Sequence, residues 1–161
     1  MTQTIAHYGC HVFIPLIVAL VFYKSNWKIV TCNGHKDSAM AVKHAEHLID
    51  GDNFVCWVPD SGEGTNGFPY HVVIDLGEPQ SLKLAGIRYL LEAAATTKVT
   101  IEGSMSPEVG FQQIGNSQQA KFNNDLSIEL DSKAKVRFVR FTFKAPSETG
   151  KVLMVGELDL R

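Results

Sequence analysis

Apolar and polar residues alternate over much of the chain after residue 24. The pattern is clearest at residues 135–143 (KVRFVRFTF), where apolar residues alternate with polar ones except for one slip near Val139. A period of two is typical of a β-strand, and a slip of this kind indicates a bulge or burial on both faces. Other strands are predicted at residues 26–32, 71–76, 82–91, 98–102, 111–114, 126–130 and 151–160.

Turn residues separate these segments and recur every 8–15 residues, as at residues 77–79 (GEP). This spacing is typical of an all-β sandwich. Helical periodicity is convincing only at residues 38–49 (SAMAVKHAEHLI), with Ser38 in the N-cap position. Because one short helix cannot cover a parallel sheet, the pattern predicts an all-β fold, an antiparallel β-sandwich.

The first 23 residues differ from the rest, because they contain no Lys, Arg, Asp or Glu. Their apolar run at residues 12–22 (VFIPLIVALVF) is shorter than the roughly 20 residues of a membrane-spanning helix. Its length matches a signal-peptide core, but no basic residue precedes it and no clear cleavage site follows. Two interpretations stay open: buried strands broken at Pro15, or the remnant of an export or anchor segment. We therefore divide the chain into an apolar N-terminal segment, residues 1–24, and a domain of residues 25–161.

The charge balance argues against one class of partner. Lys and Arg number 15 against 17 Asp and Glu, which gives a formal charge of −2. A protein that binds nucleic acid normally carries a basic surplus, so we expect no nucleic acid partner. The three cysteines are too few for a disulfide framework, although a single bridge between Cys32 and Cys56 would leave only Cys10 over.

A dense polar turn follows the predicted helix at residues 48–53 (LIDGDN). Asp50 and Asp52 flank Gly51, which adopts a positive φ at little cost and can turn both carboxylates toward one point. Hard oxygen ligands of this kind suit Ca²⁺, which takes 6–8 oxygens. The spacing is not that of an EF-hand, and an Asp-rich turn that only caps the helix is the alternative.

Five segments, of which the last two form one closing piece, resemble discoidin-like domains, a family that includes coagulation factor V/VIII C-type domains and family 32 carbohydrate-binding modules. Residues 45–57 (AEHLIDGDNFVCW) are similar to the family's A-x-x-A-I-D-G-D-x-x-T-x-W stretch. Residues 70–77 (YHVVIDLG) resemble W-I-x-I-D-L-G, and residues 84–90 (LAGIRYL) resemble I-x-G-I-R-Y-L-P. Residues 139–141 (VRF) and 156–160 (GELDL) resemble the closing A-R-Y-V-R and A-E-L-x-L. The order is that of the family, over residues 25–161.

This resemblance implies a jelly-roll sandwich with a non-catalytic role. We expect a carbohydrate-binding module that attaches a linked or partner enzyme, or a surface protein, to a glycan, with galactose-type sugars as candidates. The alternative is a cell-adhesion module that binds a protein or lipid surface, for which Phe68 is the only clear apolar loop-tip candidate. Such a module would be secreted or at the cell surface, often within a larger multidomain protein, and we expect no membrane contact.

The resemblance also implies a structural Ca²⁺ ion between the D-G-D turn and the glutamate of the last strand. Side-chain oxygens would come from Asp50, Asp52 and Glu157, and backbone carbonyls from His47, Val55 and Gly156. Val55 replaces the family's threonine and so removes a hydroxyl. A cation would neutralise three carboxylates that otherwise repel one another. The alternative is a turn without metal, in which Glu157 accepts hydrogen bonds from backbone N–H groups.

Glycan contacts are predicted in the loop at residues 59–69 (PDSGEGTNGFP) and beyond the G-I-R-Y-L strand. Sugar-binding relatives carry His after the tryptophan and Pro-Arg after that strand, whereas this chain has Val58 and residues 91–92 (LE), which weakens a galactose assignment. Aromatic rings pack on the apolar face of sugars, and polar side chains bind hydroxyl groups. The remaining candidates are Asp60, Glu63, Asn66, Phe68 and Glu92. Each of them could equally be a solvated loop residue, whereas Trp27 and Trp57 are predicted to lie in the core.

Enzymatic alternatives find little support. His44 and His47 lie three residues apart on the predicted helix, but no third zinc ligand follows at a suitable spacing. The resemblance places Cys56 in a strand position of the family pattern, where we expect it to be buried, and the carboxylates Asp125, Glu129 and Asp131 lie along or beside one strand rather than as a facing pair. The sequence therefore predicts no catalytic residue.

Overall fold

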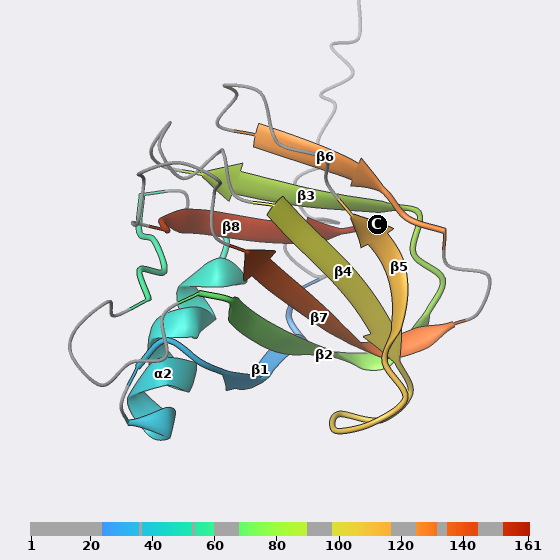
Figure 1. The fold of residues 1–161 in the computed structure, drawn as a ribbon, viewed down its shortest axis with the longest axis horizontal. Coiled ribbons are helices and arrows are strands. Elements are labelled where there is room, and N and C mark those ends of the chain that lie inside the picture. Colours follow the sequence, from blue (N-terminus) through green and yellow to red (C-terminus); the bar gives the residue numbers. More distant parts are fainter. Residues whose placement is uncertain are drawn as a thin grey trace, which may run out of the picture.

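The computed structural model describes residues 24–35, 37–52, 54–59, 68–89, 98–116, 125–131, 135–144 and 153–161. Two antiparallel sheets face each other (Figure 1). The larger sheet has the order β1-β2-β7-β4-β5 and the smaller has the order β6-β3-β8, which confirms the predicted β-sandwich. The elements are β1 (Lys28–Cys32), α2 (Ser38–Ala45), the 3₁₀ helix η1 (Glu46–Leu48), β2 (Tyr70–Gln80), β3 (Leu84–Tyr89), β4 (Lys98–Ser104), β5 (Gln112–Asn116), β6 (Asp125–Glu129), β7 (Val136–Lys144) and β8 (Val155–Leu160).

The core lies between the two sheets. Ile74 and Phe141 of the larger sheet are fully buried in one cluster with Ile87 and Leu158 of the smaller sheet. Each such side chain contributes about 1.5–3 kcal/mol by leaving water, so the facing rows hold the layers together. Trp27 and Trp57 are 5% and 2% exposed, which confirms that both belong to the core.

Trp57 joins the two sheets at one end of the sandwich. Its backbone N–H donates to the carbonyl oxygen of Val155 at 2.8 Å, and its carbonyl accepts from the N–H of Val155 at 3.1 Å. Its ring meets those of Tyr70 and Phe143 of the larger sheet, with centroids 6.4 and 5.9 Å apart. The segment after the helix is therefore fixed to both layers.

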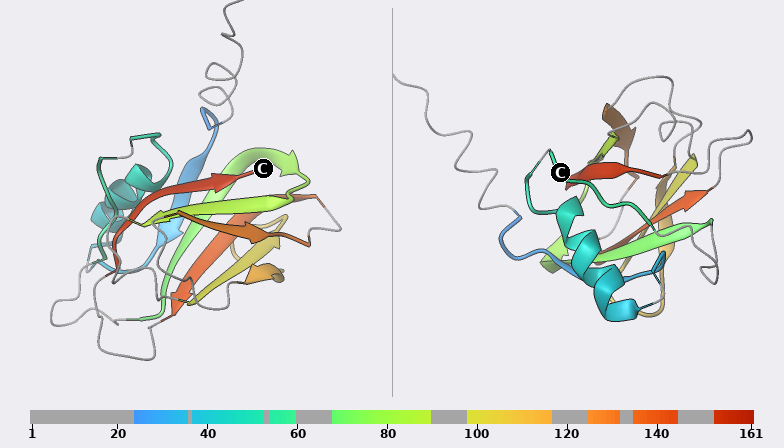
Figure 2. Two further views of the ribbon diagram at one scale, coloured as in Figure 1. Left: turned by 90° about the horizontal axis from the view of Figure 1, so that it is seen from above. Right: turned by 90° about the vertical axis from the view of Figure 1, so that its left-hand side faces the viewer.

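The N-cap of the helix lies one residue earlier than predicted. Asp37 is the N-cap in place of Ser38, because its carboxylate accepts from the N–H groups of Ala39 at 2.8 Å and Met40 at 3.3 Å. The α-helix ends at Ala45 and η1 continues it, so the predicted helix of residues 38–49 is two short elements. Figure 2 shows α2 against one side of the sandwich, where it packs on β1 while η1 packs on β8.

The predicted turn at residues 77–79 is wrong, because these residues lie within β2. Gly77 has a φ of +83°, and the pairing of β2 with β7 shifts register between Asp75 and Gln80. A β-bulge accommodates such a residue inside a strand, and glycine adopts this φ without the strain of a side chain. The turn-forming sequence therefore bends the strand and does not end it.

The slip in the alternation of β7 is confirmed as burial on both faces. Val139 is opposite Ile74 and Gly103 on the core side, whereas Phe138 is opposite Asp75 and Ser104. Because cross-strand partners share a face, Phe138 lies on the outer face of the sheet. It is nevertheless only 6% exposed, and the Arg137 guanidinium lies 5.2 Å from its ring centroid.

Cys32 and Cys56 are both free thiols, so the disulfide bridge considered from the sequence is not formed. Burial raises the pKa of the Cys32 thiol to about 11, which makes it unreactive at neutral pH. Cys10 and the apolar run of residues 12–22 lie outside the described residues. No helix in the described ranges is long and apolar enough to span a membrane.

Candidate functional site

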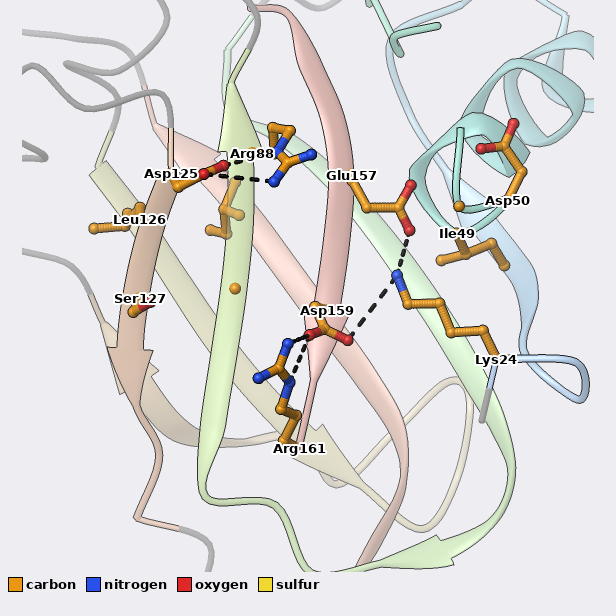
Figure 3. Close-up of a pocket in the computed structure, with 13 residues that line it drawn as sticks. Lys24, Ile49, Asp50, Arg88, Asp125, Leu126, Ser127, Glu157, Asp159 and Arg161 are labelled. Atoms are coloured by element: carbon orange, nitrogen blue, oxygen red, sulfur yellow. Dashed lines mark hydrogen bonds and ion pairs between the residues drawn. The ribbon is translucent and has the colours of Figure 1, made fainter. Parts of the chain in front are cut away.

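A groove of about 570 Å³ runs over the outer face of the smaller sheet (Figure 3). Strand register fixes its floor, because Arg88 is opposite both Asp125 and Glu157, and Gly86 is opposite Ser127 and Asp159. The absence of a side chain at Gly86 matters, since a Cβ there would lie 3.3 Å from the Cβ of Asp159. We call this feature the small-sheet groove.

Charges of opposite sign alternate across the small-sheet groove. Arg88 Nε donates to Asp125 Oδ1 at 2.8 Å, and Arg161 pairs with Asp159, also at 2.8 Å. Lys24 pairs with Glu157 between them. The groove is therefore lined by three cations and four anions, since Asp50 lines it too, and each of the three cations is paired with a carboxylate of the smaller sheet.

Lys24 is the most enclosed cation of this group, with its side chain 14% exposed. Its Nζ donates to a carboxylate oxygen of Glu157 (Figure 3). It also donates to the carbonyl oxygen of Leu158 at 2.8 Å. Asp159 Oδ1 lies 4.0 Å from the same nitrogen, and the Trp27 ring centroid lies 5.6 Å away. The ammonium group is therefore surrounded by oxygen atoms of the last strand and by one aromatic face.

The predicted meeting of the acidic turn (residues 50–52) with the closing glutamate is confirmed. Asp50, Gly51 and Glu157 line the same groove, although they are far apart in the sequence (Figure 3). Burial raises the pKa of Glu157, the Lys24 ammonium opposes that rise, and the charge of Asp50 adds to it. The electrostatic influence of Asp50 on Glu157 follows directly from their proximity.

Local hydrogen bonds already occupy the acidic turn. Asp50 Oδ1 accepts from the N–H of Asp52 at 2.8 Å, and Asp50 Oδ2 lies 2.9 Å from His47 Nδ1. Asp52 Oδ1 accepts from the N–H of Phe54, again at 2.8 Å. Side-chain bonds of this kind are typical of Asx turns, and with Gly51 at a φ of +79° they hold the turn without a ligand.

A calcium ion does not fit these residues as they are arranged. Within the described ranges, no three His, Cys, Asp or Glu side chains come close enough together to hold a metal ion. The ring of His47 is hydrogen-bonded to Asp50, whereas the prediction made the backbone carbonyl of His47 a calcium ligand. One carboxylate oxygen of Glu157 accepts a hydrogen bond from Lys24. Asp159 Oδ1 is buried without a hydrogen-bond partner among the described residues, and the carboxylates of Glu157 and Asp159 flank the Lys24 ammonium.

Of the other two predicted carbonyl ligands, Val55 lies in the loop after the acidic turn and Gly156 lies in β8. The Val55 side chain is 37% exposed, whereas Gly156 is buried next to Glu157. Calcium binding itself stays a prediction, which a titration of the protein tests.

The strands that flank the two segments predicted to bind glycan end at the same end of the sandwich. In the larger sheet, Tyr70 is opposite Phe143, and Lys98 is opposite Lys144. In the smaller sheet, Tyr89 is opposite Val155. Trp57 contacts Tyr70 with its ring and Val155 with its backbone, so these strand ends coincide. We call this the loop end.

Four of the five predicted glycan contacts lie outside the described residues: Asp60, Glu63, Asn66 and Glu92. The fifth, Phe68, is half-buried, and its ring centroid lies 4.6 Å from that of Tyr70 at the loop end. Phe68 packs against the core as well. It therefore presents only part of its ring to a ligand, and it is not the freely exposed apolar loop tip that the adhesion alternative requires.

Phe54 is the exposed aromatic residue that sequence reasoning missed. Phe54 is 95% exposed, and Val55 and Val58 on the same segment are 37% and 43% exposed. The available signal was an aromatic residue directly after a polar turn (DGDNF), where no strand or helix could bury it. Two acidic residues, Asp50 and Asp52, precede it in the sequence.

A smaller pocket of about 330 Å³ lies on the outer face of the larger sheet. Arg140 donates to both oxygens of Glu102, at 2.7 and 2.8 Å, and its guanidinium lies 4.3 Å from the Phe111 ring centroid. His71 lines the same pocket. Burial lowers the pKa of His71, and the positive charge of Arg140 lowers it further.

The residues considered for enzymatic roles do not converge. His44 stacks edge-on against His35, with centroids 5.6 Å apart, whereas His47 pairs with Asp50. Asp125 is paired with Arg88, and Glu129 lies four residues further along the same strand.

Comparison with known proteins finds one family that covers most of the chain. The F5/8 type C domain family matches residues 29–158, and a family of unknown function (DUF6122) matches residues 1–49. No curated protein is similar enough in sequence to match.

Solved structures share the fold. The C-terminal domain of a chitobiase from Bacteroides fragilis has a TM-score of 0.71 and 23% identity, over 86% of this chain and 95% of that one. CpGH89CBM32-5 of Clostridium perfringens, solved with GalNAc-β-1,3-galactose, has a TM-score of 0.67 and 17% identity, over 86% and 96%. The family 32 carbohydrate-binding module of C. perfringens NanJ, solved with galactose, has a TM-score of 0.65 and 17% identity, over 86% and 95%.

Proposed function

Since the chain belongs to the F5/8 type C domain family, we propose that it is a non-catalytic module that binds glycans. The observation that carries the proposal is the family match over residues 29–158, which spans nearly all of the described sandwich. Two structures with the same fold hold galactose-containing sugars. Galactose-type glycans are therefore the first candidates for this chain.

The module would act by bringing an attached or associated enzyme, or a surface protein, to a glycan. A tethered binding module raises the local concentration of substrate without adding chemistry. The similar chitobiase domain supports this role, since it is one part of an enzyme. A protein that binds extracellular polysaccharide would be secreted or held at the cell surface.

We place the glycan contacts at the loop end. The described strand ends there form a fixed frame, because Trp57 joins both sheets and Phe68 stacks on Tyr70. Binding residues are often carried on loops that such a scaffold positions. Asp60, Glu63 and Glu92 would accept hydrogen bonds from sugar hydroxyls, and Asn66 would donate or accept them. The accessible part of Phe68 would meet an apolar sugar face.

The test is a glycan array probed with the purified full chain, with galactose, N-acetylhexosamine, fucose and uronic acid glycans represented. We expect binding to one class, and we expect Asn66→Ala and Glu92→Ala each to weaken it about tenfold through the loss of hydrogen bonds. Glu78→Ala is the matched control for Glu92→Ala, because Glu78 is exposed in the β2 bulge, outside the loop end. A folded protein that binds no glycan contradicts the proposal.

The exposed side chain of Phe54 supports a second candidate, adhesion to a protein surface. An aromatic residue that is 95% exposed gains free energy when a partner covers it. The acidic residues before it disfavour an anionic lipid surface. Under this alternative, the glycan array is negative and Phe54→Ser abolishes binding to the partner protein. Under the glycan proposal, the array is positive and glycan binding survives Phe54→Ser.

A further inference from the structure

The side chain of Lys24 connects the start of the described domain to its last strand. The carbonyl oxygen of Lys24 accepts from the N–H of Trp27 at 3.0 Å, just before β1. Its ammonium group reaches Glu157, 133 residues further along the chain. One side chain thereby ties the first turn of the domain to β8.

We propose that the Lys24 ammonium is the built-in cation of this domain and takes the place of a bound calcium ion. It lies where the acidic residues of two distant segments, Asp50 and Glu157, line one groove. It contacts a Glu157 oxygen and the Leu158 carbonyl, which are the kinds of ligand that Ca²⁺ selects. The proposal does not depend on the glycan function.

The charge balance supports this assignment. Glu157 and Asp159 are both mostly buried, with side chains 12% and 20% exposed. Two neighbouring carboxylates in such a position are unfavourable unless a cation lies between them. Lys24 supplies that positive charge, and Arg161 neutralises the other side of Asp159.

The same geometry disfavours a metal ion in addition to Lys24. A calcium ion needs 6–8 oxygen ligands, and it would compete with the ammonium group for the Glu157 carboxylate. The oxygens of Asp50 are directed to the Asp52 N–H and the His47 ring. A divalent cation would therefore have to displace Lys24 and break the bonds of the acidic turn.

The consequence is a domain whose closure does not depend on calcium. The Trp27 ring covers the ammonium on one side, so the ion pair is shielded from solvent and from salt screening. Breaking a buried pair by removing one partner is strongly destabilising, because the other charge stays buried and unpaired.

The test compares melting temperatures of the full chain in excess EDTA and in millimolar CaCl₂, for the wild type and for Lys24→Met. We expect the wild-type Tm to be equal in the two buffers. We expect Lys24→Met to melt about 5–10 °C lower in EDTA, and Lys83→Met, an exposed lysine, to melt like the wild type.

Two results overturn the proposal. The first is a wild-type Tm that rises by several degrees with calcium, because a ligand that binds the native state must stabilise it. The second is a Lys24→Met variant as stable as the wild type in EDTA. If Lys24→Met fails to fold, the comparison of the wild-type Tm in EDTA and in CaCl₂ still tests the proposal. Glu157→Gln is then the second variant, and it must melt below the wild type.

Discussion

At the residue scale, charged side chains on both outer faces are arranged as pairs across neighbouring strands. Arg137 on β7 donates to both oxygens of Asp75 on β2 at 2.9 Å, and this contact holds the pKa of Asp75 below its usual range. Arg140 binds Glu102 on β4 in the same two-pronged way. Bidentate pairs fix geometry more strongly than single contacts, so they help to set strand register.

His71 makes stability depend on pH. Its pKa is lowered from 6.5 by burial and by Arg140, so the unfolded chain takes up its proton at a higher pH than the folded chain does. The contribution of neutral His71 to the free energy of unfolding is then fully present above about pH 6.5. It decreases as the pH falls below that value. Arg140 and Lys144 of the same pocket repel a protonated imidazole, and Glu102, which attracts it, is already paired with Arg140.

We expect the unfolding free energy of the wild type to decrease between pH 7 and pH 5. For His71→Gln we expect a smaller decrease over the same range. Urea denaturation at each pH measures this difference. His44→Gln, an exposed position on α2, is the control and should follow the wild type. If the unfolding free energy decreases equally as the pH falls in the wild type and in His71→Gln, His71 does not cause the pH dependence.

At the scale of elements, the short helix α2 depends on its cap and on the strand beneath it. A helix of eight residues is marginal on its own, so packing on β1 and the Asp37 cap must both contribute. The helix in turn leads through η1 to the acidic turn, which lines the small-sheet groove. Loss of the cap would therefore loosen the segment that carries Asp50.

Asp37→Ala should cost about 1 kcal/mol, because two N–H groups lose their acceptor. The expected decrease in Tm is about 2–4 °C for a chain of this size. Asp37→Asn retains the acceptor oxygen and should lie near the wild type. Calorimetry that finds Asp37→Ala and Asp37→Asn equally stable would contradict the role of the cap.

At the scale of the whole molecule, local patterns predicted the sandwich but not the contacts that close it. Alternation along β7 marked both the strand and the slip at Val139, because side-chain period follows directly from strand geometry. The bulge at Gly77 was read as a turn, since glycine with positive φ occurs in both. A turn and a bulge are distinguished by how β2 pairs with β7, and this pairing is known only from the folded sheet.

The candidate site was predictable only in part, for the same reason. The meeting of Asp50 with Glu157 came from resemblance to a family, whereas Lys24 was assigned to the apolar segment before the domain. No local pattern marks a lysine whose partner is 133 residues away. Likewise, the exposure of Phe54 and the burial of Phe68 depend on what packs around them: Tyr70 covers Phe68, and Phe54 projects into solvent.

The measurement that tests the account most directly is an NMR titration of the isotope-labelled full chain with the glycan that binds best on the array. A glycan module with its site at the loop end predicts saturable amide shifts at Val58, Phe68 and Tyr89, with no change at Ser127 or Asp159 in the small-sheet groove. A folded chain whose amides show no saturable shift with any glycan class, or shift only in the small-sheet groove, contradicts the account.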